Sequence, residues 1–204
     1  MRWPNLRRYQ RWLMVTGWGL LTLGIVFVGV IGMLPEPVPE PDAIPPALVP
    51  RQRVVIFLVD TEEYFDTHGV YVRSVIQQQC ATCMLQLVNL HGDLSLLALH
   101  QALQYVYATS RTYEASTTTL VNLSLGTYTY DAALHTVVRA LDARGILLIA
   151  SAGNDNVAEP FYPAALPEVF GVCASTRHTH TKAVYSNFGA WVSLCAPGLQ
   201  YVSR

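Results

Sequence analysis

The sequence predicts an α/β domain with a mostly parallel sheet, preceded by one transmembrane helix. Short apolar runs rich in β-branched residues alternate with segments of helical periodicity, and one long uncharged run stands near the N-terminus. Such runs are typical of parallel strands buried on both faces, and their alternation with helices is typical of α/β folds. The 204 residues are 51% hydrophobic and 13% charged, which excludes a disordered chain. A net charge of −1 argues against a nucleic-acid partner, and four cysteines are too few for a disulfide scaffold.

The N-terminal quarter of the chain reads as a membrane anchor and a spacer. Residues 12–34 carry no charge, and a helix of that length spans a hydrocarbon core of about 30 Å. A cleaved signal peptide and a buried soluble helix are the alternatives. Four arginines lie in the basic segment 1–11, so the positive-inside rule predicts a cytoplasmic N-terminus. The proline-rich segment 35–50 is expected to be an extended linker between the membrane and the domain of residues 51–204. The whole chain is thus expected to be a single-pass cell-membrane protein with this domain outside the cytoplasm.

The elements of the domain follow from periodicity. Apolar runs predict five strands, at 54–59, 84–90, 120–125, 146–150 and 169–174. Helical spacing predicts three helices between them, at 69–79, 94–108 and 131–144, the last ending at Gly145, a natural position for a C-cap. In folds of this kind the functional residues stand just past the carboxyl ends of the strands.

Three residue types of interest stand at such strand ends. Asp60 follows the first strand, His68 opens the next helix, and Asn154 follows the fourth strand. An acid that orients an imidazole, the imidazole as a base, and an amide that stabilises an oxyanion are the parts of a nucleophilic hydrolase.

Seven segments, in order, resemble the subtilisin-like serine peptidases (subtilases, peptidase family S8). They are the strand ending in Asp60-Thr61, His68-Gly69, Asn122-Leu-Ser124-Leu125-Gly126, Ala150-Ser-Ala-Gly153-Asn154, Tyr162-Pro163-Ala164, Tyr185-Ser-Asn-Phe-Gly189 and Ala196-Pro197-Gly198. The resemblance spans residues 54–198 and implies a three-layer fold of subtilisin type.

The resemblance also implies roles for individual residues. Asp60 would hold the imidazole in its working tautomer, His68 would be the general base and then the general acid, and Asn154 would donate to the oxyanion. The edge formed by Ser124, Leu125 and Gly126, together with Gly153, would bind the backbone of a protein or peptide substrate. The implied activity is that of a serine endopeptidase. An inactive peptide-binding module or pseudoenzyme of the same fold is the alternative.

The sequence departs from the family pattern at three places. The aspartate motif reads Asp-Thr-Glu-Glu at 60–63 and lacks a glycine, so the turn after the strand should differ. The gap between Asp60 and His68 is very short. No Gly-Thr-Ser, the family's nucleophile motif, occurs in the 204 residues. We therefore expect that this chain represents the family truncated before its nucleophile motif, an incomplete domain that is inactive by itself.

Other candidate sites are weaker. Cys80 and Cys83 could form a local disulfide, whereas Cys173 and Cys195 look like buried core residues. His178 and His180 lack a third metal ligand, and His91 is a rival to His68 as the catalytic histidine. Subtilases often bind structural calcium, but no acidic loop offers enough oxygen ligands, so no metal or other cofactor is assigned.

Overall fold

The computed structural model describes residues 53–62, 68–176 and 181–198, and the fold is that of these residues. The segments predicted as basic N-terminus, transmembrane helix and linker lie outside them, as do His178 and His180. In the described ranges no helix combines the length and the hydropathy needed to cross a bilayer.

The core of the domain is a six-stranded parallel sheet with the strand order β2-β1-β3-β4-β5-β6. This confirms the predicted α/β class. The elements along the chain are β1 (Val54–Asp60), α3 (His68–Gln79), β2 (Met84–Asn89), α4 (Leu96–Ser110), β3 (Thr118–Leu123), α5 (Ala132–Ala143), β4 (Leu147–Ser151), β5 (Val169–Ser175) and β6 (Leu194–Pro197).

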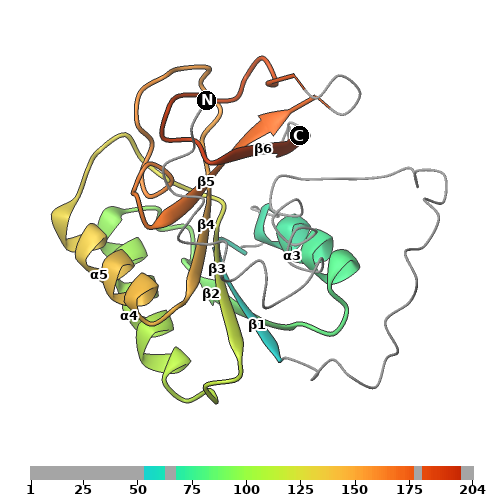
Figure 1. Ribbon diagram of the computed structural model, residues 1–204, viewed down its shortest axis with the longest axis vertical. Coiled ribbons are helices and arrows are strands. Elements are labelled where there is room, and N and C mark those ends of the chain that lie inside the picture. The colour runs from blue at the N-terminus through green and yellow to red at the C-terminus, as the bar shows by residue number, and fades with distance from the viewer. Residues whose placement is uncertain (1–52, 63–67, 177–180, 199–204) are drawn as a thin grey trace.

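The helices lie on both faces of the sheet (Figure 1). Helix α3 covers one face, and α4 and α5 lie side by side on the other. Right-handed crossovers require this arrangement: the connection from β1 to β2 moves in one direction along the sheet, whereas those from β2 to β3 and from β3 to β4 move in the other. Three layers result, as the resemblance implied.

Strand β1 lies inside the sheet, between β2 and β3, with helices on both faces, which explains why its sequence is a continuous apolar run. Successive side chains of a strand point to opposite faces. Val55, Phe57 and Val59 enter the cluster beneath α4 and α5, whereas Ile56 and Leu58 enter the cluster beneath α3. All five side chains are fully buried, so a polar residue at any of these positions would lose its water without gaining a partner.

All eight predicted strands and helices are present, and their ends differ from the predicted bounds by no more than a residue or two. Strand β6 was not predicted, because four residues that end in a proline carry no periodic signal. The prediction that Cys173 and Cys195 are both buried core residues was wrong. Cys195 is exposed, and the two form a disulfide because they face each other across β5 and β6. Cys80 and Cys83 form a second, local disulfide.

Candidate active site

The candidate site lies where the direction of the sheet connections reverses. Strand β1 is flanked by β2 and β3, and the helices that follow β1 and β2 lie on opposite faces of the sheet. Such a switch point leaves a crevice past the carboxyl ends of the two diverging strands. Asp60 ends β1, Ser124 follows the neighbouring β3, and Asn154 lies just beyond β4, the next strand along. The topology therefore places these residues side by side at the carboxyl ends of the parallel strands.

Asp60 and His68 are in direct contact. His68 Nδ1 lies 2.8 Å from Asp60 Oδ1, which also accepts a hydrogen bond of 2.8 Å from the Thr61 amide. The aspartate side chain is 4% exposed and the histidine side chain 36% exposed. A carboxylate at Nδ1 favours the tautomer that carries its proton there, in which Nε2 is the basic nitrogen. The pair thus presents a base to the solvent side while its acid stays buried.

Asp60 and His68 are only eight positions apart in the sequence, and a backbone contact at the start of α3 brings the two side chains together. The Gly69 amide donates to the Thr61 carbonyl oxygen at 3.0 Å, so the first turn of the helix folds back onto the end of β1. A Cβ atom at position 69 would lie 2.5 Å from that oxygen and 2.8 Å from Glu62 Cγ. Glycine is therefore the residue that permits this close approach. One turn further on, Arg73 Nε lies 3.3 Å from Glu62 Oε1.

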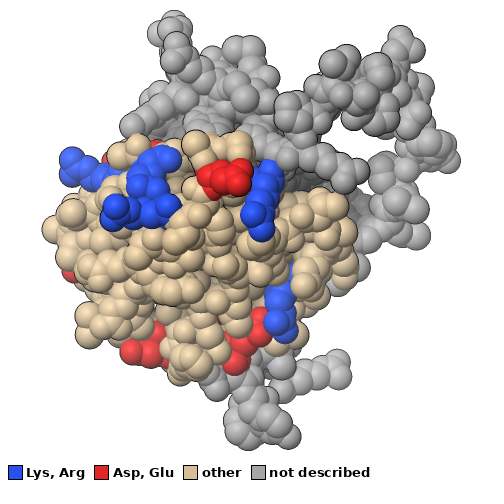
Figure 2. Space-filling model, turned by 90° about the horizontal axis from the view of Figure 1, so that it is seen from below, with Lys and Arg blue, Asp and Glu red and all other residues tan. Residues whose placement is uncertain are grey.

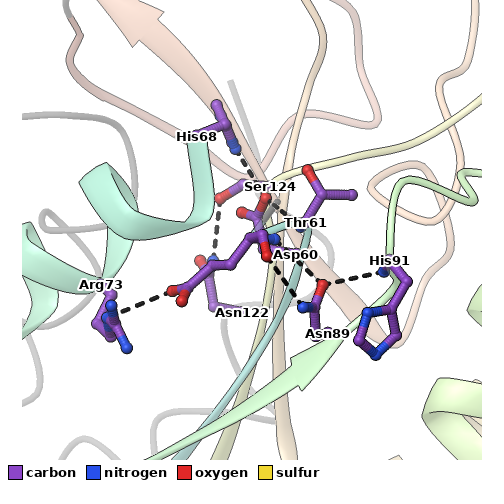
Figure 3. Close-up of polar contacts among 9 residues, drawn as sticks. Asp60, Thr61, His68, Arg73, Asn89, His91, Asn122 and Ser124 are labelled. Carbon is purple, nitrogen blue, oxygen red and sulfur yellow. Dashed lines mark hydrogen bonds and ion pairs between the residues drawn. The ribbon is translucent and has the colours of Figure 1, made fainter. Parts of the chain in front are cut away.

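Asn89 holds the residues that follow Asp60 in place (Figure 3). Its Oδ1 accepts from the Glu62 amide at 3.1 Å, and its Nδ2 donates to the Glu62 carbonyl oxygen at 3.1 Å. Because an amide side chain can satisfy both backbone groups of one residue, Asn89 fixes the backbone of Glu62, the position at which the family pattern has a glycine. Sequence reasoning missed this residue, since the two partners are 27 positions apart.

His91, the rival histidine, lies in the turn after β2 and not at the carboxylate. Its backbone amide donates to Asn89 Oδ1 at 2.9 Å, and its φ of 51° places it in the left-handed region. The structure brings His68 to Asp60, as the sequence analysis preferred.

A pocket of about 380 Å³ opens beside the Asp60–His68 pair. Its walls are formed by the end of β1 with His68, by three leucines at the start of α4, and by the segment that follows β3. The lining residues are Asp60, Thr61, His68, Leu94, Leu96, Leu99, Ser124, Leu125, Gly126 and Thr127. The three residues predicted as a substrate-binding edge thus share one cavity with the two predicted catalytic groups. Asn122, which precedes them, is buried and donates from Nδ2 to Ser124 Oγ at 2.9 Å.

Asn154 is exposed at the end of β4, and its neighbours are fixed by a buried asparagine. The backbone amide of Asn187 donates to the Gly153 carbonyl oxygen at 3.0 Å. The side-chain Oδ1 of Asn187 accepts from the backbone amide of Asp155 at 2.9 Å. Asn154 is not among the residues that line the pocket. It lies at the same carboxyl end of the sheet as Asp60, two strands further along.

Tyr128 extends this network towards β3. Its hydroxyl donates to Asp155 Oδ2 and accepts from Asn187 Nδ2 at 2.9 Å. Desolvation by burial, and next the hydrogen bond to the Asp155 carboxylate, raise the pKa of Tyr128 above its ordinary value. The phenol therefore stays protonated as a donor at neutral pH.

No group of three His, Cys, Asp or Glu side chains within the described ranges is arranged to hold a metal ion. On the face shown in Figure 2, residues of both charges occur and much of the surface is uncharged.

Fold and site together define a class: a three-layer α/β domain with an Asp–His pair and a strand edge in one pocket, an arrangement used for acyl transfer. The chain belongs to the subtilase family (peptidase family S8), whose model matches residues 81–203. Asp60 and His68 precede the matched residues, so the family match does not cover them, and their pairing is seen in the 2.8 Å contact between their side chains.

Relatives support this membership. The chain is 44% identical over 80 residues to "Subtilisin-like protease 12" of Arthroderma gypseum, covering 39% of this chain and 20% of the relative. It is 34% identical over 84 residues to "Thermophilic serine proteinase" of Bacillus sp. strain AK1, covering 41% and 21%. The match to "Subtilisin BL" of Lederbergia lenta is 33% over 84 residues, covering 41% and 31%. The chain thus matches a third or less of the length of each of these relatives.

Solved structures show the same fold. The prenylagaramide maturation protease PagA superposes with a TM-score of 0.59 at 22% identity, covering 72% of this chain and 63% of that one. A psychrophilic subtilisin-like protease of the Antarctic psychrotroph Pseudoalteromonas sp. AS-11 gives 0.57 at 17% identity, covering 72% and 41%.

Proposed function

We propose that this chain provides the aspartate and histidine of a subtilisin-like serine endopeptidase. The observation that carries the proposal is the 2.8 Å contact between His68 Nδ1 and Asp60 Oδ1 at the wall of a pocket that Ser124, Leu125 and Gly126 also line. Family membership and the similarity to named proteases support it. The substrate is an extended peptide segment, because a strand edge binds peptide through backbone hydrogen bonds.

Each group has a role in the proposed reaction. His68 Nε2 takes the proton of a serine hydroxyl, whose oxygen attacks the peptide carbonyl carbon. Asp60 stabilises the imidazolium that forms, and Asn154 donates to the oxyanion; such a donor typically contributes about 3–4 kcal/mol to the transition state. His68 then gives its proton to the leaving amine as the peptide bond breaks. In the second half, His68 takes a proton from water as the water oxygen attacks the acyl carbon, and it returns that proton to the serine oxygen as the ester bond breaks and the acid product leaves.

The nucleophilic serine is proposed to lie in a Gly-Thr-Ser segment, a motif that the 204 residues do not contain. The direct test is a fluorophosphonate probe applied to the protein expressed from its own gene. Labelling that is lost in His68→Ala supports the proposal. Peptide binding without any labelling would reject it in favour of the alternative, a non-catalytic peptide-binding module on the same fold.

We propose further that residues 12–34 anchor this domain to the cell membrane with the N-terminus in the cytoplasm. The uncharged run and the preceding arginines support it. The two disulfides, Cys80–Cys83 and Cys173–Cys195, also support an extracytoplasmic domain, since structural disulfides persist in oxidising compartments.

The anchor is tested by membrane fractionation of cells that produce the whole chain. We expect the protein to stay in the membrane fraction after a carbonate wash, and external protease to digest the domain in intact cells. Release by the wash, or complete protection from external protease, would contradict the proposed topology.

A further inference from the structure

The proposed reaction defines where one substrate side chain must lie. The carbonyl oxygen of the cleaved bond points to Asn154, and the chain that precedes it pairs with Ser124–Gly126. The side chain of the residue that carries this carbonyl therefore points between two segments, 124–126 and 153–154. Gly126 and Gly153 line that space, and neither contributes a side chain to it.

In this chain an aromatic ring already occupies the space between the two glycines. A Cβ atom added at Gly126 would overlap the Phe161 ring, and one added at Gly153 would lie 3.3 Å from Phe161 Cδ1. The ring is therefore in contact range of both walls. Phe161 is half-buried, and it is not one of the residues that line the pocket beside His68.

The position of Phe161 is fixed by the backbone next to it. Tyr162 and Thr127 form an antiparallel bridge, with the Thr127 amide donating at 2.8 Å and the Tyr162 amide donating at 2.7 Å. These two bonds hold residue 161 directly beside Gly126.

A second ring holds the side chain itself. The Tyr128 ring packs edge-on against Phe161, with their centroids 4.9 Å apart, and the Tyr128 hydroxyl is held by Asp155 and Asn187. Moving the Phe161 ring aside would break this aromatic contact and disturb the hydrogen bonds that fix the neighbours of Asn154. The ring is thus part of a connected structure and not a loose surface side chain.

From this geometry we infer that Phe161 closes the subsite for the residue before the cleaved bond, so that the peptidase selects glycine or alanine there. The inference rests on the proposed function and names its substrate class. A ring that fills the space excludes branched and aromatic side chains, because overlap in a packed site is costly. Discrimination by the size of a side chain is typically worth about 10–200-fold in kcat/KM.

The test compares peptides that differ only in the residue before the cleaved bond: glycine, alanine, leucine or phenylalanine. For the wild-type protein, expressed from its own gene, we expect kcat/KM for glycine or alanine to exceed that for phenylalanine by about 100-fold. In Phe161→Gly the space opens, and the preference should move towards phenylalanine by at least about tenfold. Tyr105→Ala is the control, because Tyr105 is an exposed aromatic residue on α4 and its removal should leave the ranking unchanged.

Binding of product peptides, which end in the variable residue, separates the two proposals. If no peptide is cleaved but glycine-ended and alanine-ended peptides bind more tightly, and Phe161→Gly reverses the order, the subsite inference holds and the peptidase function fails. If cleavage occurs but wild type prefers leucine or phenylalanine, the subsite inference is overturned and the peptidase stands. If no peptide of either series binds, both are overturned. Should Phe161→Gly fail to fold, the wild-type ranking still decides.

Discussion

Replacing Gly69 by alanine tests whether the start of α3 sets the geometry of the Asp60–His68 pair. The added methyl group would lie 2.5 Å from the Thr61 carbonyl oxygen, whereas ordinary contacts begin at 3.4 Å. The first turn of the helix must therefore retreat by about 0.9 Å, and His68 is the neighbouring residue. A retreat of that size takes the 2.8 Å contact with Asp60 out of hydrogen-bonding range.

The expected magnitudes follow from the overlap. Inserting a methyl group into a filled space costs about 1–3 kcal/mol in the free energy of unfolding. Helix propensity alone predicts the opposite sign, a gain of about 1 kcal/mol for glycine to alanine inside a helix. A misplacement of about 1 Å at the reacting groups should lower kcat/KM by about 100-fold.

For the protein expressed from its own gene, urea unfolding measures the first quantity and peptide hydrolysis measures the second. Val70→Ala is the control, because Val70 lies in the same turn but is 42% exposed, so its change should stay within about 0.5 kcal/mol. A Gly69→Ala variant as stable as wild type or more stable would refute the reasoning, since propensity would then outweigh the close approach to Thr61.

Three further predictions address the other parts of the structure. Asp60→Asn should keep the fold but lower kcat by about 10⁴-fold, because an amide no longer selects the working tautomer of His68; an activity loss below tenfold in a steady-state assay would contradict this. Replacing both Cys173 and Cys195 by alanine should lower the free energy of unfolding by about 3 kcal/mol, since the bond closes a loop of 22 residues, and an unchanged urea midpoint would argue against it. Asp155→Asn should lower the pKa of Tyr128, which nevertheless stays above its ordinary value because burial, the larger cause, remains; NMR titration of ¹³C-labelled tyrosine checks this, and an unchanged or higher pKa would be the contrary result.

Periodicity predicted the regular elements well because each signal is local. The continuous run at 54–59 indicated a strand covered on both faces, and β1 is an interior strand whose side chains are buried on both faces. The terminal strand β6 escaped because its pairing, and not its composition, makes it a strand. Strand pairing is also what the prediction for Cys195 lacked. Its composition suggested a core residue, whereas its register opposite Cys173 places it in a disulfide.

The candidate site was predictable to the extent that its residues stand at strand ends. Asp60 and His68 were identified from that rule and from their resemblance to a family. The residues that support them were not, because Asn89 acts through a contact 27 positions away and Phe161 through its approach to two glycines. Such contacts arise only when distant segments meet, so no spacing in the sequence signals them.

The position of β1 between β2 and β3 also has a consequence during synthesis of the chain. β1 is the first described strand to leave the ribosome, yet it pairs on one side with β2 and on the other with β3, which begins only at Thr118. At about 5–20 residues per second, β3 appears about 3–12 s after β1 is complete. For that interval the edge of β1 that pairs with β3 is open, although α3, β2 and α4 have already been synthesised. Helix α3 and strand β2, the first elements to follow β1, are the earliest cover that the protein itself supplies for its apolar side chains and its other edge.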